Sequence, residues 1–319
     1  AGAVAVPVNF LNRRDELGYV LRQSDSVLLV TMDRFRDLDY LRALDELAPG
    51  WEREGGREAF PKLRRVVVFP ASGQPVRAGA LSFERLCAAS APWQSPQPRD
   101  AHSVSDIIYT SGTTGSPKGV LLTHDMLLRT AYGSAYARAF EDGRRILFSL
   151  PMYHVYGYVE GLLSVLFVGG SIIPQLKFDA VATLRGIERH RATDVLLIPT
   201  MTLAILDELR RGSYDLSSLH AVISSGGRSP PYIWEQIFEL MRPREVTTGY
   251  GMTEVTASST VTRPDDPLER LAGTNGRLRD VGAAGAGAPD GRLVSYRVVD
   301  PETGQDLPAG EVGELLARG

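Results

Sequence analysis

Apolar and polar positions follow two different periods along the chain, and the elements they predict alternate. Short runs of Val, Ile and Leu bounded by Gly, Pro, Asp or Ser are typical of buried strands. We predict strands at residues 3–8, 27–31, 65–69, 146–150, 171–174, 195–198 and 221–224. Amphipathic segments between these runs predict helices at residues 13–22, 33–47, from 125 onward, 159–168, 180–189, 203–211 and 232–241.

Strands that are separated by helices indicate βαβ units. We therefore predict an α/β fold with parallel-rich sheets sandwiched by helices. Residues 71–104 are rich in Pro, Ser and Ala and predict a connecting segment with one short helix at 83–88. Residues 263–291 are dense in Gly, Asp, Pro and Arg and predict a loop. The β-rich end, residues 292–317, predicts an antiparallel hairpin of strands 292–299 and 312–317.

The composition excludes several classes of protein. The chain has 319 residues, of which 43% are hydrophobic and 23% charged, as in ordinary soluble domains. A net charge of −3 does not indicate nucleic acid or an anionic membrane as a partner. Cys87 is the sole cysteine, which excludes an intrachain disulfide and a multi-cysteine metal site. Without an apolar run long enough for a bilayer or a secretory signal, we expect a cytoplasmic enzyme.

The first candidate motif is Asp106-Ile-Ile-Tyr-Thr-Ser-Gly-Thr-Thr-Gly-Ser-Pro-Lys-Gly-Val120, in which an apolar run leads into a loop of glycines and hydroxyl residues. Glycines let backbone N–H groups approach phosphate oxygens, and Lys118 adds a positive charge. The loop ends neither in Gly-Lys-Ser/Thr nor in a dinucleotide-binding glycine pattern. It predicts a polyphosphate site of another kind within residues 109–120.

The second candidate motif, at residues 248–254, is Thr248-Gly-Tyr-Gly-Met-Thr-Glu254 and follows a short apolar run. Its glycines let the backbone pass close to a ligand, and Tyr250 offers a ring face for a base. Thr253 and Glu254 place a hydroxyl beside a carboxylate, as a phosphate with Mg²⁺ requires.

Together these motifs resemble the signatures of the adenylate-forming superfamily, which includes acyl- and aryl-CoA synthetases, firefly luciferases and peptide-synthetase adenylation domains. The resemblance is greatest to fatty acyl-CoA synthetases. It implies catalytic roles for Lys118, His154, Thr253 and Glu254, with Glu254 helping to hold Mg²⁺. It implies that the β- and γ-phosphates of ATP bind at Thr110, Ser111, Gly112, Thr113, Thr114, Gly115 and Lys118.

The same resemblance implies an adenine-binding surface built from two segments. Its residues are Gly226, Gly227, Arg228, Thr248, Gly249, Tyr250 and Gly251. Arg228 stands where relatives carry a small residue after the glycine pair. We interpret it as a contact with a polar substrate group or as a surface salt bridge, and we favour the salt bridge.

The segment Leu150-Pro-Met-Tyr-His-Val-Tyr-Gly157 matches the part of the family that lines the acyl pocket. A buried ammonium needs an anionic partner, and Val155 stands near the position where amino-acid-activating members carry an acidic residue. An α-amino acid substrate is therefore not expected, and an alkyl or plain acyl group is. The implied acyl pocket consists of His154, Val155, Tyr156, Gly157, Gly251 and Met252.

The sequence therefore predicts most of the large N-terminal adenylation domain over residues 1–319, as a fragment that lacks the small C-terminal domain. The expected reaction converts a medium- or long-chain fatty acid and Mg·ATP to acyl-AMP and then to a thioester with CoA. Three alternatives remain open: a ligase that loads a phosphopantetheinyl carrier protein, an aryl-acid CoA ligase, and a non-catalytic nucleotide-binding module.

Overall fold

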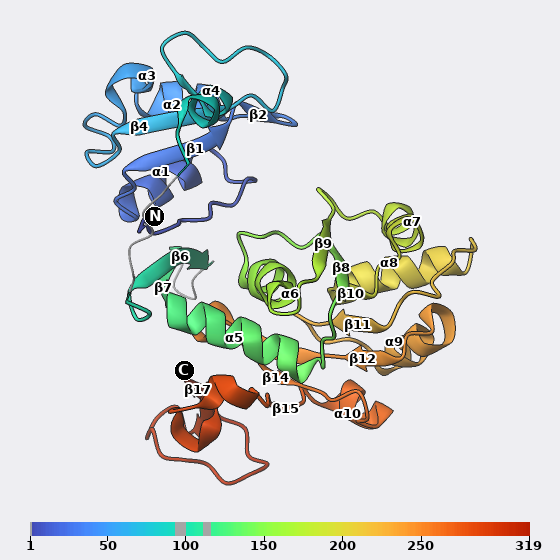
Figure 1. The fold of residues 1–319 in the computed structure, drawn as a ribbon. Helices are drawn as coiled ribbons and strands as arrows, with labels where there is room; N and C mark the ends of the chain where they lie inside the picture. The colour runs from blue at the N-terminus through green and yellow to red at the C-terminus, as the bar shows by residue number, and fades with distance from the viewer. Residues whose placement is uncertain (1, 93–99, 111–115) are drawn as a thin grey trace. The chain divides into compact units, whose positions relative to one another are not determined.

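A computed structural model describes residues 2–92, 100–110 and 116–319 (Figure 1). The chain divides into two compact units, Ala1–Leu121 and Leu122–Gly319, each of which has its own sheets. Among the described residues, no helix is both long and apolar enough to cross a membrane.

The first unit is built on a three-stranded parallel sheet in the order β1-β4-β5. Its strands are β1 (Leu28–Met32), β4 (Arg65–Phe69) and β5 (Leu81–Ser82). The helices are α1 (Arg14–Gln23), α2 (Tyr40–Leu47), α3 (Trp51–Glu54) and α4 (Phe83–Ala89). Leu44, Trp51, Phe60 and Val68 form the centre of the core, which joins these helices to the sheet.

Two predictions in the first unit are wrong. Residues 3–8 do not form a strand, because only Ala5 makes a bridge, with Asp106. The helix predicted at 33–47 begins at Tyr40, after the short strands β2 (Arg34–Phe35) and β3 (Leu38–Asp39). Asp39 fixes this start, because its carboxylate accepts a hydrogen bond from the Arg42 backbone N–H at 2.9 Å as a helix cap.

The second unit has a five-stranded sheet in the order β12-β11-β10-β8-β9, and every neighbouring pair is parallel. Its strands are β8 (Arg145–Phe148), β9 (Ser171–Pro174), β10 (Asp194–Leu197), β11 (Ala221–Ser224) and β12 (Glu245–Thr247). All residues of β10 and β11 are buried, as expected of central strands covered on both faces. The predicted bounds of β9 and β11 are confirmed.

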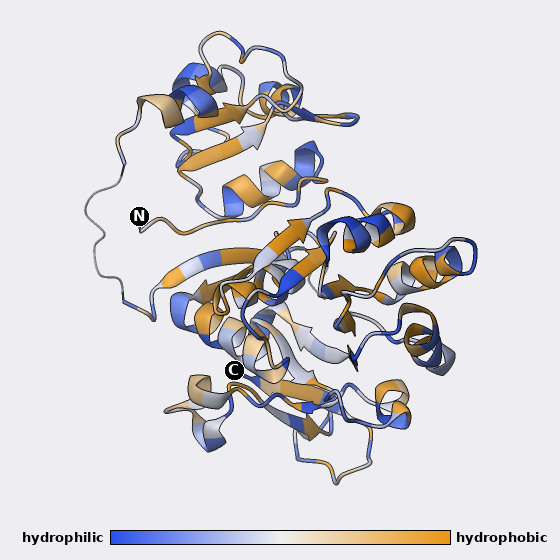
Figure 2. Ribbon diagram, turned by 45° about the vertical axis from the view of Figure 1, so that its right-hand side comes forward, coloured by the Kyte–Doolittle hydropathy of each residue, from blue (hydrophilic) through white to orange (hydrophobic). Residues whose placement is uncertain are grey.

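Helical segments cover both faces of this sheet. They are α5 (His124–Ala137), η1 (Tyr156–Leu163), α6 (Ser164–Leu166), α7 (Ala180–His190), α8 (Pro199–Leu209), α9 (Pro231–Gln236) and η2 (Ile237–Met241). Leu147 and Val222 pack in one core cluster with residues of α7, α8 and α9. Phe148 packs in another with residues of η1 and α6. Figure 2 shows the strands of the sheet as largely hydrophobic and the helices as two-faced. The predicted α/β fold is confirmed.

The end of the second unit is mainly antiparallel. A three-stranded sheet contains β13 (Gly249–Met252), β14 (Ala257–Val261) and β15 (Arg277–Leu278), with the turn η3 (Thr253–Val255) after β13. Strands β16 (Ser295–Val299) and β17 (Glu314–Arg318) pair antiparallel, which confirms the predicted hairpin. The loop prediction for 263–291 is wrong in part, because α10 (Leu268–Gly273), β15 and the turns η4 (Gly282–Gly285) and η5 (Pro289–Gly291) lie there.

Candidate functional site

The phosphate motif belongs to a two-stranded sheet of β6 (Val104–Thr110) and β7 (Lys118–Thr123). Thr110 ends β6, and Lys118 begins β7 with an exposed side chain. The predicted residues Ser111–Gly115 lie outside the described part of the chain. At the base of the segment, the Tyr19 hydroxyl donates a hydrogen bond to the Pro117 carbonyl oxygen at 2.8 Å, which anchors the approach to Lys118.

The glycine-rich segment after β11 lies at the carboxyl end of the parallel sheet, the edge where open α/β sheets bind ligands. Gly226, Gly227 and Arg228 are all exposed, and Gly226 has a φ of +87°. The Ser225 hydroxyl donates to the Gly249 carbonyl oxygen at 2.6 Å, so this segment is joined to β13. Arg228 makes no ion pair with any residue that the structure describes, and the salt-bridge interpretation gains no support.

The second motif forms strand β13 and the start of the turn η3, and β13 pairs with β14 in an antiparallel hairpin. A side chain would not fit at two of its glycines: a Cβ would lie 2.4 Å from the Thr260 carbonyl oxygen at Gly249 and 1.9 Å from that of Ala257 at Gly251. Thr248 is fixed at the start of the hairpin, because its backbone N–H donates to the Thr262 hydroxyl at 2.9 Å. The glycines thus allow a tight hairpin.

The three residues Met252, Thr253 and Glu254 end β13 and enter the turn η3. Met252 is half-buried and Thr253 is only 6% exposed, whereas Glu254 is exposed. Within the described ranges, the Glu254 carboxylate has no hydrogen-bond or ion-pair partner. The neighbouring Tyr250 is half-buried, and its ring centroid lies 6.3 Å from that of Tyr296.

Glu254 fits the magnesium ion that the resemblance implies. Among the described residues, no group of three or more His, Cys, Asp or Glu side chains could hold a metal ion. Mg²⁺ at a nucleotide site needs no such cage, because one or two carboxylates, waters and the substrate phosphates complete its octahedron. The Glu254 carboxylate, exposed and without a partner among the residues that the structure describes, is suited to that role.

The predicted acyl segment, residues 150–157, leads into η1, which begins at Tyr156. The His154 Nδ1 atom accepts a hydrogen bond from the Tyr156 backbone N–H at 3.2 Å, and the Tyr156 hydroxyl donates to the Leu197 carbonyl oxygen at 3.1 Å. His154 is solvent-accessible, yet surrounding protein desolvates its ring and lowers the pKa of the imidazole. Val155 is buried, and at Gly157 a Cβ would lie 2.6 Å from the Pro151 carbonyl oxygen.

A buried charged cluster beside these segments was missed by sequence reasoning. Glu160 of η1 is 3% exposed, and its carboxylate lies 3.2 Å from Arg279 Nη1 and 3.7 Å from Arg138 Nη2. It also accepts hydrogen bonds from the Ser134 hydroxyl and from the Ser258 backbone N–H, the latter at 3.2 Å. The signal in the sequence was one acidic residue inside an otherwise apolar helical run.

Opposing electrostatic effects act on the Glu160 carboxyl. Desolvation raises its pKa, but the charges of Arg279 and Arg138 and the donated hydrogen bonds outweigh desolvation, and the pKa lies below its usual value. Glu160 is therefore ionised at neutral pH. Burial lowers the pKa of Arg138, although a guanidinium remains charged because its ordinary pKa is far above neutrality.

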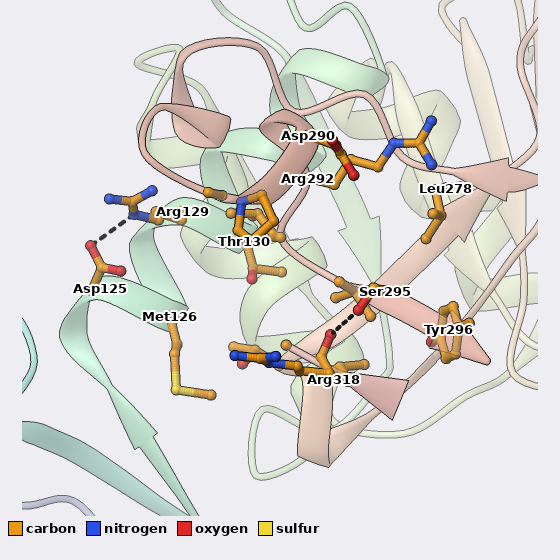
Figure 3. Close-up of a pocket in the computed structure, with 17 residues that line it drawn as sticks. Asp125, Met126, Arg129, Thr130, Leu278, Asp290, Arg292, Ser295, Tyr296 and Arg318 are labelled. Atoms are coloured by element: carbon orange, nitrogen blue, oxygen red, sulfur yellow. Dashed lines mark hydrogen bonds and ion pairs between the residues drawn. The ribbon is translucent and has the colours of Figure 1, made fainter. Parts of the chain in front are cut away.

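A cavity of about 620 Å³ lies next to the motif but contains none of the predicted site residues. Val255 and Thr256, which follow Glu254, form part of its wall. Figure 3 shows Asp125 paired with Arg129 on one side of the cavity and Ser295 hydrogen-bonded to Arg318 on another.

The parallel sheet covered by helices, with glycine-rich segments at its carboxyl edge, is typical of α/β proteins that bind a nucleotide. Residues 1–319 match the family model described as AMP-binding enzyme, and the chain belongs to this family. It is 32% identical, over its whole length, to the mitochondrial medium-chain acyl-CoA ligase ACSF2 of Danio rerio and covers 52% of that protein.

Two further relatives extend this comparison. Over 87% of the chain it is 33% identical to the 3-[(3aS,4S,7aS)-7a-methyl-1,5-dioxo-octahydro-1H-inden-4-yl]propanoyl:CoA ligase of Mycobacterium tuberculosis (strain ATCC 25618 / H37Rv), of which it covers 52%. The crystal structure of the anthranilate CoA ligase AuaEII in complex with anthranoyl-AMP gives a TM-score of 0.81 at 25% identity and covers 99% of this chain, which matches 55% of that one. The chain thus spans about half the length of the relatives it matches.

Proposed function

We propose that this chain is the large adenylation domain of an acyl-CoA synthetase. The motif Thr248–Glu254 carries the proposal, because it combines a buried threonine, Thr253, with an exposed carboxylate at Glu254 that has no partner among the described residues. Membership of the AMP-binding enzyme family supports it. In the first half-reaction, a carboxylate oxygen of the acid attacks the α-phosphorus of ATP. The bond from that phosphorus to the bridging oxygen breaks, and pyrophosphate leaves.

The main barrier to this reaction is electrostatic, because an anionic acid must approach an anionic triphosphate. Lys118 and the loop Thr110, Ser111, Gly112, Thr113, Thr114 and Gly115 would bind the β- and γ-phosphates and stabilise the charge on the leaving group. Thr253 would orient the α-phosphate. Glu254 would hold Mg²⁺, which supplies further charge neutralisation when it is bound.

The adenine would lie against Tyr250 and the glycine segment Gly226–Gly227. The hydrogen bond from Ser225 to Gly249 supports this assignment, because it joins the two segments that would contact the base. Arg228, exposed and without an ion-pair partner among the described residues, is available for a polar group of the ligand.

The acid would bind near His154 and Tyr156. The apolar Val155 supports an acid without an α-ammonium group, and the relative from Danio rerio supports a medium-chain fatty acid. The likeness to the anthranilate CoA ligase favours a second candidate, activation of an aromatic acid.

In the second half-reaction, a thiol attacks the acyl carbonyl carbon and AMP leaves, so that a thioester forms. The names of the relatives support CoA as the thiol, and a phosphopantetheinyl carrier protein is the alternative acceptor. His154, which its lowered pKa keeps neutral at physiological pH, would lie beside the path of the incoming thiol.

The test is pyrophosphate release by the protein that contains this chain, with Mg·ATP and a panel of fatty acids, benzoate derivatives and amino acids, with and without CoA. Release with an alkyl or aryl acid, followed by thioester formation with CoA, is expected. Release without a CoA thioester would identify a carrier protein as the acceptor. Release only with amino acids would contradict the interpretation of Val155.

A further inference from the structure

The buried cluster around Glu160 connects four elements that carry or support the candidate site. Glu160 lies in η1, Ser134 in α5, Arg138 directly after α5, Ser258 in β14, and Arg279 directly after β15. We propose that Glu160 is a positioning residue that holds the adenine hairpin in register with the acyl segment. This inference rests on the proposed function.

Glu160 links the acyl segment to the hairpin through the chain on one side and a hydrogen bond on the other. Glu160 lies four residues after Tyr156 on η1 and six residues after His154, which precedes η1. Its Oε1 atom accepts the Ser258 backbone N–H at 3.2 Å, and Ser258 pairs across the hairpin with Gly251. One carboxylate therefore joins the acyl segment to the strand opposite the Tyr250–Glu254 motif.

The surrounding cluster holds Glu160 itself through several hydrogen bonds and ion pairs. Arg138 Nη2 donates at 2.7 Å to the Glu160 carbonyl oxygen and at 2.8 Å to the Ser164 hydroxyl, which in turn donates to the same carbonyl at 2.7 Å. Arg279 Nη2 donates to the Thr130 carbonyl oxygen at 3.2 Å while Nη1 contacts the carboxylate. Both the backbone and the side chain of Glu160 are thus held.

Burying the charges of this cluster costs free energy of desolvation. Two arginines and one carboxylate, all at least nine-tenths buried, lose much hydration, and well-packed apolar residues would serve stability equally well or better. Apolar residues, however, could not accept the hydrogen bond from the Ser258 N–H, and they could not offer Arg279 a negative charge at a fixed position. The cluster therefore suits a positional role between the two halves of the reaction site.

The test compares Glu160→Gln with Asp194→Asn in the protein that contains this chain. Asp194 is a similarly buried acid, paired with Arg144 at 3.6 Å, and among the described residues its side chain makes no hydrogen bond or ion pair with the hairpin. Both variants replace a buried carboxylate by an amide. Acyl-AMP formation is measured in a single turnover, which separates the rate of the burst from its amplitude.

We expect Glu160→Gln to lower the burst rate about 10- to 100-fold while the amplitude stays complete, because folded molecules hold the substrates out of register. The Asp194→Asn variant should keep the wild-type rate, even where its thermal stability falls. If the two variants have equal rates, or if Glu160→Gln lowers only the amplitude, the positioning role is wrong.

Hydrogen exchange gives a readout that does not depend on activity. The Ser258 amide should exchange about tenfold faster in Glu160→Gln than in Asp194→Asn. If the Gln variant does not fold, Arg279→Lys keeps the positive charge without the guanidinium fork and should show the same two changes, whereas a wild-type rate would contradict the inference. A wild-type protein that forms no acyl-AMP would instead overturn the proposed function.

Discussion

Thr253 and Glu254 are neighbours in the sequence, yet the protein buries one side chain and exposes the other. The short turn η3 turns the chain at this point, so that the Thr253 side chain is buried and the Glu254 carboxylate is presented to solvent. An exposed carboxylate is suited to an ion that arrives with its nucleotide.

At this scale the account predicts the effect of Glu254→Gln. The substitution keeps the size of the side chain but removes the charge that would hold Mg²⁺. We expect the Mg²⁺ concentration for half-maximal pyrophosphate release to rise at least about tenfold. A magnesium titration at saturating ATP measures this.

Glu269→Gln is the matched control, because Glu269 is another exposed glutamate, on α10. Its magnesium requirement should equal that of the wild-type protein. An unchanged requirement in Glu254→Gln would remove Glu254 from the proposed metal site.

Glu160 also predicts a dependence of stability on pH. Its pKa in the folded protein lies below the ordinary value of 4.5. Between these two pKa values the unfolded chain binds more protons, so the stabilisation is complete above about pH 4.5 and is lost as the pH falls through the folded pKa. Denaturant unfolding should therefore show that the stability difference between wild type and Glu160→Gln shrinks on acidification. A difference that grows at acid pH would contradict the assignment.

At the scale of elements, the hairpin β13–β14 has little tolerance for side chains on its glycines. The Gly251 backbone passes so close to Ala257 that a Cβ would overlap its carbonyl oxygen. A register shift between Tyr250 and Gly251 accompanies this approach. Backbone proximity, rather than a special φ angle, therefore explains the glycine at this position.

We expect Gly251→Ala to destabilise the protein by about 2–4 kcal/mol and to displace Tyr250, with a loss of nucleotide affinity. Gly273→Ala is the control, because a Cβ at this helical position would meet nothing within 4 Å. Alanine there should be neutral or stabilising by up to about 1 kcal/mol. Thermal unfolding of both variants measures the effect, and equal stabilities would show that the hairpin can open to admit the methyl group.

At the scale of the whole molecule, the local pattern of apolar residues predicted the strands of the parallel sheets better than the segments that surround them. The bounds of β9 and β11 follow from apolar runs between polar residues and breakers, which depend only on neighbouring positions. The start of α2 was misplaced, because the cap at Asp39 and a two-strand turn outweigh the helical periodicity of residues 33–39.

The residues of the candidate site also differ in whether the local sequence could predict them. Lys118, Thr253 and Glu254 were predicted as site residues because each lies in a contiguous motif whose residue types suit a nucleotide phosphate or its metal ion. Glu160 and Arg279 are 119 positions apart and meet only in the folded chain, so their ion pair could not be read from spacing. Sequence reasoning found the groups proposed to contact the substrates but not the buried residues that support them.

The most direct test of the account is exchange of labelled pyrophosphate into ATP by the protein that contains this chain, measured with and without a carboxylic acid. Reversible adenylation predicts exchange that requires both Mg²⁺ and an alkyl or aryl acid and that does not require CoA. Exchange that is absent with every acid, although ATP binds, would contradict the enzyme assignment and would favour a nucleotide-binding module.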